Sequence, residues 1–126
     1  MPKYVLPQPH RVRKIEGSFA WLDHRLVRHG FLPMMTHQDQ SLYLFLVLAA
    51  DRHGVSFYRK ENICEAIGLD FQPFEIAKDR LISLGLIAFG SYSALSPNGF
   101  YQVLPVDGQP PAMAPDVSKL LGLKSV

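Results

Sequence analysis

The 126-residue sequence contains one cysteine, Cys64, and this scarcity excludes several kinds of site. An intrachain disulfide needs two cysteines, and a cysteine-rich zinc site needs more. No histidine stands at a catalytic spacing from Cys64, so a Cys/His nucleophile is not expected. The glycines stand singly at expected helix ends and turns, which excludes a glycine-rich phosphate loop. We therefore expect neither an enzyme nor a cofactor.

Metal ligands and long apolar runs are also missing. His24 and His29 are five residues apart, whereas side chains three or four apart share a helix face, so no metal site is expected. The longest apolar run, residues 42–50, is too short to cross a bilayer. No apolar stretch follows the basic residues of the N-terminus, as it does in a signal peptide. We expect a cytoplasmic protein with no membrane partner.

The charge is unevenly distributed, although its total of +2 favours no partner. Residues 1–30 hold six Lys and Arg against two acidic residues, a net charge of +4. Residues 61–90 hold two against five, a net charge of −3. The basic cluster Arg11, Arg13 and Lys14 has two interpretations: an arm that contacts DNA phosphates, or a solvated tail.

The length and the apolar content of 48% are those of one domain with a real core. We divide the chain into an extended basic arm (1–17), a folded domain (18–104) and a proline-rich linker with a C-terminal tail (105–126). Asp116 is expected to cap a short helix over residues 117–121. That tail either docks on a folded domain or ends free.

Two helices are expected before the middle of the chain. Residues 18–29 have the spacing of an amphipathic helix, with Phe19, Leu22 and Leu26 facing inward. A second helix begins after Thr36, where Asp39 completes a variant of the capping box. Because residues 42–50 are apolar on nearly every side, this helix is expected to be buried from several directions.

Residues 62–87 predict two helices joined by a tight turn. Gly68 suits the left-handed residue that ends the first helix, and Asp70 is a good N-cap for the second. Pro73 lies in the first turn of that second helix, where a missing N–H costs little. Short strands are expected at residues 55–58, 86–89 and 100–104, with a loop over residues 90–99 that contains the turn signal Asn98-Gly99.

This pattern resembles the winged helix-turn-helix proteins, and in particular bacterial regulators of the GntR and MarR type. The resemblance lies in residues 67–70, in Ala77 within the second helix, and in Leu81 and Leu84 leading to residues 85–87. It implies an α+β fold that is mainly α with a small antiparallel sheet, here with an extra N-terminal helix. It also implies a DNA-binding protein, either a small transcriptional regulator or a replication or mobile-element accessory factor, and a homodimer formed through the N-terminal helix.

In such proteins the second helix of the motif enters the major groove. Gln72 can pair with adenine, and Glu75 can accept a hydrogen bond from cytosine. The full set of expected DNA contacts is Gln72, Glu75, Lys78, Arg59, Lys60, Arg11, Arg13 and Lys14. The alternative is a protein-interaction module that uses the acidic motif and the aromatic residues Tyr92, Phe100 and Tyr101. A positive surface around Gln72 and Glu75 would favour DNA, and a negative or apolar one would favour protein.

Overall fold

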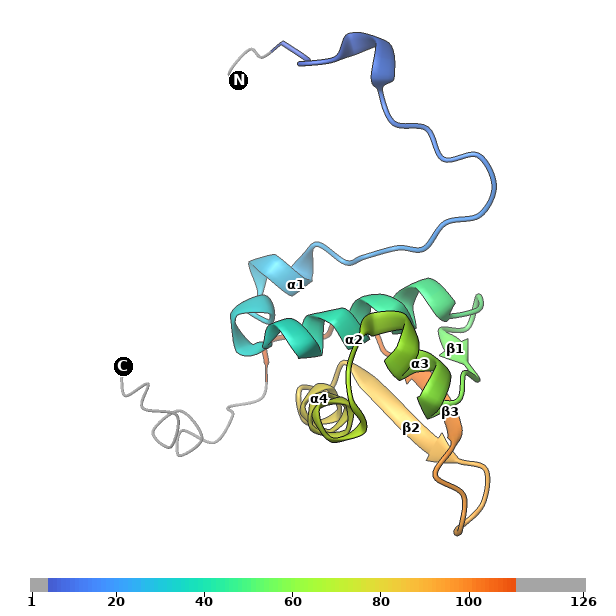
Figure 1. Cartoon of the computed structure of the whole chain (residues 1–126). Helices are drawn as coiled ribbons and strands as arrows, with labels where there is room; N and C mark the ends of the chain where they lie inside the picture. The colour runs from blue at the N-terminus through green and yellow to red at the C-terminus, as the bar shows by residue number, and fades with distance from the viewer. Residues whose placement is uncertain (1–4, 111–126) are drawn as a thin grey trace.

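The computed structural model describes residues 5–110, which form an α+β fold (Figure 1). The described residues form four α-helices, a three-stranded antiparallel sheet and two 3₁₀ turns. The predicted fold class is confirmed at this level. The helices are α1 (Arg25–Arg28), α2 (His37–Ala49), α3 (Lys60–Ile67) and α4 (Phe71–Ser83). The strands are β1 (Val55–Ser56), β2 (Ile87–Ser91) and β3 (Gly99–Val103), and the 3₁₀ turns are η1 (Pro9–Arg11) and η2 (Leu32–Met34).

The capping box predicted at the start of α2 is confirmed. The Thr36 hydroxyl accepts the Asp39 N–H at 3.1 Å, and the Asp39 carboxylate accepts the Thr36 N–H at 2.9 Å. These bonds satisfy two N–H groups that a helix start leaves free. The same carboxylate, 1% exposed, lies 2.9 Å from the Arg80 guanidinium of α4. One side chain thus both starts α2 and joins it to α4.

The hydrophobic core lies between the inner face of α2, the pair α3 and α4, and one face of the sheet. Leu42 and Leu46 of α2 are fully buried. The residues they pack among include Ile63 from α3, Phe74, Ala77 and Leu81 from α4, and Ile87 and Tyr101 from the sheet. Helix α2 is buried from several directions, as predicted, by α3, α4 and the sheet, but its outer face is uncovered, because Leu44 and Leu48 are 46% and 65% exposed.

The sheet has the order β1-β3-β2, so β3 is the central strand. Strands β2 and β3 form a hairpin in which Ser91 faces Gly99 (Figure 1). A Cβ atom on Gly99 would lie 2.0 Å from the Gly90 carbonyl oxygen, so only glycine fits at this crossing. The turn predicted at Asn98-Gly99 is wrong in position: the turn of this loop falls at residues 94–95, and Gly99 is already the first residue of β3.

The helix predicted over residues 18–29 is wrong in extent, because only Arg25–Arg28 is α-helical. The Asp23 carboxylate accepts the Arg25 N–H at 2.8 Å, and this bond marks where α1 begins. Hydrogen bonds from Arg25 lower the pKa of Asp23 to about 2. Leu26 is buried as predicted, but Phe19 and Leu22 are 60% and 54% exposed. The N-terminal helix through which the predicted homodimer would form is thus reduced to a single turn.

The two ends of the described chain behave differently. Residues 5–17 run away from the body as an extended arm that contains η1 (Figure 1). At the other end, Val106 is 2% exposed, and the Gly108 carbonyl accepts a hydrogen bond from His29 Nδ1 at 2.6 Å. The helix predicted at residues 117–121 lies outside the described residues. No helix among residues 5–110 is long and apolar enough to traverse a bilayer.

Replacing Leu46 by Asp should abolish folding, since a carboxylate would be buried there without a partner. We expect the free energy of unfolding to fall by about 4 kcal/mol or more, which is comparable to the whole stability of many small domains. The matched control is Leu44→Asp, two positions away on the exposed side of α2, which should keep a cooperative thermal transition. Circular dichroism melts compare the two. Equal destabilisation by both variants would contradict the burial described above.

Candidate nucleic-acid interface

The turn between α3 and α4 has the predicted geometry. Gly68 adopts φ = +71°, and its N–H donates to the Cys64 carbonyl at 2.9 Å. Asp70 occupies the N-cap position with extended backbone, as predicted, but its side chain makes no capping hydrogen bond. Its carbonyl accepts the Phe74 N–H at 3.1 Å, which begins the hydrogen bonding of α4. The turn fixes the direction in which α4 leaves α3.

Three of the predicted DNA contacts form one cluster with each other. The carboxylate of Glu75 lies 3.2 Å from Lys60 Nζ and 3.3 Å from Lys78 Nζ. The two lysine side chains are only 18% and 13% exposed, and their ammonium groups also lie over aromatic rings, Lys60 over Phe71 and Lys78 over Phe89. Both cations are therefore occupied in holding α3, α4 and β2 together.

The protonation of Glu75 fits this arrangement. Partial burial raises the pKa of Glu75, but hydrogen bonds and positive charge from Lys60 and Lys78 outweigh it, so the net shift is downward. The carboxylate stays ionised at neutral pH and neutralises one of its two lysines. Consequently Glu75 has little freedom to accept a hydrogen bond from a base unless the cluster opens.

The loop between β2 and β3 is attached to the start of α3 by a residue whose role the sequence did not reveal. The side chain of Asn98 accepts the Lys60 N–H at 2.9 Å, a bond that the N-cap residue Arg59 does not supply. Ser96 Oγ in turn accepts the Asn98 N–H at 3.1 Å. Asn98 marked a turn in the sequence, but nothing in the pattern linked it to a helix 38 positions away.

The outward side of α4 carries no basic residue along its most exposed line. Gln72, Ile76 and Asp79 follow one another at helical spacing and are all exposed. Ile76 is 53% exposed and Phe71, beside this line, is 49% exposed. The surface around Gln72 is thus apolar and acidic rather than positive. Of the predicted contacts on this motif, Arg59 is the accessible cation, with a side chain 68% exposed and a loose pair to Glu61 at 3.5 Å.

The structure does not bring the N-terminal basic cluster to α4. Arg11, Arg13 and Lys14 are exposed, and the Arg11 guanidinium donates to the nearby Gln8 side chain at 3.0 Å. In Figure 1 the arm lies on the opposite side of α2 from α4 and the hairpin. The predicted DNA contacts therefore fall into three groups: the exposed Gln72 and Arg59, the cluster around Glu75, and the distant arm.

Aromatic side chains gather on the outer face of the sheet. Phe100 packs edge-to-face with Phe57 and Tyr92, with ring centroids 5.9 and 5.3 Å away, and all three are about half exposed. Gly90 leaves room for the Phe100 ring on the neighbouring strand. Tyr101, which the sequence placed on this surface, is 1% exposed and belongs to the core instead. Phe57, which was not among the predicted aromatic residues, completes this group instead.

Cys64 is a buried free thiol. Burial raises the pKa of its thiol, so the reactive thiolate is disfavoured at neutral pH. Comparison of the chain with protein-family profiles, with curated proteins and with solved structures finds no match. Function therefore has to follow from the surfaces described above.

Replacing Asn98 by Ala should destabilise the protein by about 1 kcal/mol, because the start of α3 would lose its capping acceptor. Urea denaturation measures the change, and hydrogen exchange at the Lys60 amide should quicken. Ser93→Ala, in the same loop, is the matched control. If the control costs as much as Asn98→Ala, the bond to Lys60 is not what stabilises the helix.

Proposed function

We propose that the protein is a winged helix-turn-helix protein that binds double-stranded DNA, either as a small transcriptional regulator or as a replication or mobile-element accessory factor. The supporting observation is the rigid unit made by α3, α4 and the β2–β3 hairpin. Gly68 sets the turn, the Glu75 cluster holds the two helices, and Asn98 attaches the loop to α3. The first turns of α4 are left open to a groove, with Gln72 exposed.

The positions proposed to touch DNA change with this geometry. Gln72 remains the candidate for reading a base, and Arg59 remains a phosphate contact. We assign positioning roles to Lys60, Lys78 and Glu75, because the Glu75 carboxylate pairs with both lysines. The remaining phosphate contacts come from Arg11, Arg13 and Lys14 of the arm, which is long and unattached enough to follow a duplex.

This arrangement gives DNA binding with few phosphate contacts. With Arg59 and the three arm cations in contact, log K should fall against log salt concentration with a slope of about −4. Fluorescence anisotropy with a labelled mixed-sequence duplex, from low to near-physiological salt, measures this slope. No binding at low salt by the folded protein would overturn the proposal.

Charge-removal variants locate the docking face in the same titration. Replacing Arg11, Arg13 and Lys14 together by Gln should make the slope shallower by about 3, and Arg59→Gln by about 1. Arg28→Gln, an exposed cation on α1, is the control with the same charge change. A loss as large for Arg28→Gln as for Arg59→Gln would mean that only total charge matters and that no face is defined.

The variant Glu75→Gln tests the cluster by removing a negative charge instead of a positive one. Without the carboxylate, Lys60 and Lys78 lose their neutralising partner, and their charge becomes available to a polyanion. We expect tighter DNA binding at low salt and a slope steeper by 1 to 2. A thermal melt checks that the fold survives. Weaker binding by a folded variant would instead assign Glu75 a direct role in contacting bases.

A second candidate function is supported by the apolar and acidic character of α4. Phe71 and Ile76 on α4, together with the aromatic group Phe57, Tyr92 and Phe100, offer a surface suited to another protein. This function is the one that remains if the anisotropy titration shows no DNA binding at low salt.

A further inference from the structure

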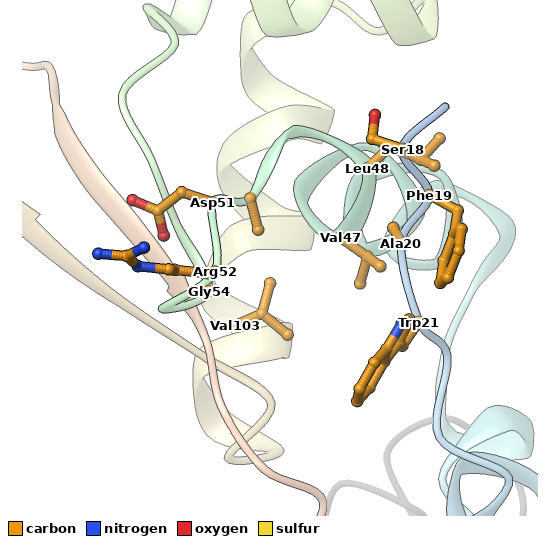
Figure 2. A pocket seen from close by; sticks show the side chains of 11 residues that line it. Ser18, Phe19, Ala20, Trp21, Val47, Leu48, Asp51, Arg52, Gly54 and Val103 are labelled. Carbon is orange, nitrogen blue, oxygen red and sulfur yellow. The ribbon is translucent and has the colours of Figure 1, made fainter. Parts of the chain in front are cut away.

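A cavity of about 700 Å³ lies between the segment 18–21 and the end of α2. Figure 2 shows Trp21 and Val103 on facing sides of it, with Val47 of α2 between them. Phe19 and Leu48 extend the apolar wall, and the turn over residues 50–54 closes one end. A concave, mainly apolar surface of this size has the shape typical of a binding site.

The walls of this cavity are left largely uncovered by the chain itself. Trp21, the only tryptophan, is 81% exposed, and Leu48 is 65% exposed. Leu44, one turn earlier on the same face of α2, is 46% exposed. Apolar surface concentrated in this way on one face indicates that something covers it in solution.

The N-terminal arm, residues 5–17, carries exposed apolar side chains that match the apolar walls of the cavity. Val5, Leu6, Val12 and Ile15 are exposed along it, and within the described chain the hydrogen bonds of residues 5–17 run only between Arg11 and Gln8. Its 13 residues can span about 43 Å when extended, roughly twice the ~20 Å length of α2. The arm is long enough to reach across to another molecule.

The net charges of the arm and of the folded body also favour the arm as the segment that covers the cavity. Residues 5–17 hold three basic residues and one acidic residue, a net charge of +2. Residues 18–110 hold seven basic and nine acidic residues, a net charge of −2. An arm and a body of opposite charge, with matching apolar surfaces, complement each other. Within one chain, segment 18–21 already forms a wall of the cavity and carries the arm away from it (Figure 1).

We propose that a second copy of the chain covers this cavity: residues 5–17 of each chain lie in the cavity of the other, with Val12 and Ile15 against Trp21 and Leu48. The exchange is reciprocal, so a two-fold dimer closes with both cavities filled. The proposal does not depend on DNA binding and is tested without DNA. It replaces the interface through a long N-terminal helix with one through an extended arm.

Sedimentation velocity and tryptophan emission of the full chain, measured from low to high micromolar concentration, test the association. Because Trp21 is the only tryptophan, its emission reports on the cavity. We expect a monomer–dimer equilibrium and an emission that shifts to the blue as dimer forms. A monomer at all concentrations would overturn the proposal, whether its emission stays red or is blue throughout because the arm folds back on its own cavity.

Paired variants distinguish arm exchange from any other dimer. The arm variant combines Val12→Ser with Ile15→Ser, and the cavity variant is Leu48→Ser; all three residues are exposed, so folding should be kept. Each variant alone should raise the dimer Kd at least tenfold. Leu95→Ser, at a loop position 96% exposed and away from the cavity, is the control and should leave the Kd unchanged.

Mixing the two variants gives the decisive result. In an exchanged dimer, the intact arm of one chain meets the intact cavity of the other, so one of two contacts is restored. The mixture should therefore associate more tightly than either variant alone. A mixture no tighter than its components, or a dimer that neither variant weakens, would overturn arm exchange.

Discussion

Burial of the inner face of α2 is the constraint on which the rest of the structure depends. Leu42 and Leu46 lie where α3, α4 and the sheet converge, so each of those elements is placed by its contact with one helix. At roughly 1.5–3 kcal/mol for each large apolar side chain, this burial is the main favourable contribution to folding. Asp39 helps to fix the orientation of α4 against α2, because its carboxylate accepts the Thr36 N–H at the start of α2 and pairs with Arg80 of α4. The outer face of α2 stays uncovered, and its exposed leucines belong to the surface that the proposed dimer would cover.

The ion cluster around Glu75 shows how positional stability and DNA affinity compete for the same charges. The Glu75 carboxylate is 41% exposed, and ion pairs that reach solvent contribute about 0–1 kcal/mol each, so the cluster matters more for orientation than for stability. Its two lysines each contact an aromatic ring as well, and together they join α3, α4 and β2. A helix pair held in this way needs no ligand to be rigid. The cost is that the motif presents little free positive charge to a phosphate backbone.

The features that could be predicted from sequence are those whose cause lies within a few residues. The capping box of Thr36 and Asp39 and the left-handed Gly68 are local, and each was found where expected. The turn signal Asn98-Gly99 was not, because Asn98 bonds to Lys60 and Gly99 already pairs in β3. The helix predicted over residues 18–29 is mostly absent, because apolar residues at helical spacing form a helix only where another part of the protein covers them. There the body covers Leu26 alone, and Asp23 starts the helix late.

The part of the candidate site that could not be predicted from the sequence depends on contacts between positions far apart in the chain. Lys60 and Glu75 are 15 residues apart, and Lys60 and Asn98 are 38 apart, so no periodicity or motif links them. The basic residues at positions 60 and 78 looked like free cations for this reason. Because they are paired, the motif offers little accessible positive charge beyond Arg59, and the arm becomes the main source of it.

The arm then connects the two proposals through geometry. In a monomer, the arm lies on the opposite side of α2 from α4, so its cations reach a duplex bound at Gln72 only when the arm bends around the body. In a two-fold dimer with exchanged arms, each basic cluster is carried by the partner's body, so two motifs and two clusters belong to one rigid particle. Linked sites bind a polymer far more strongly than separate ones, because the second contact is intramolecular. A chain whose single motif carries a net negative charge would thus gain DNA affinity from its own association rather than from the recognition helix.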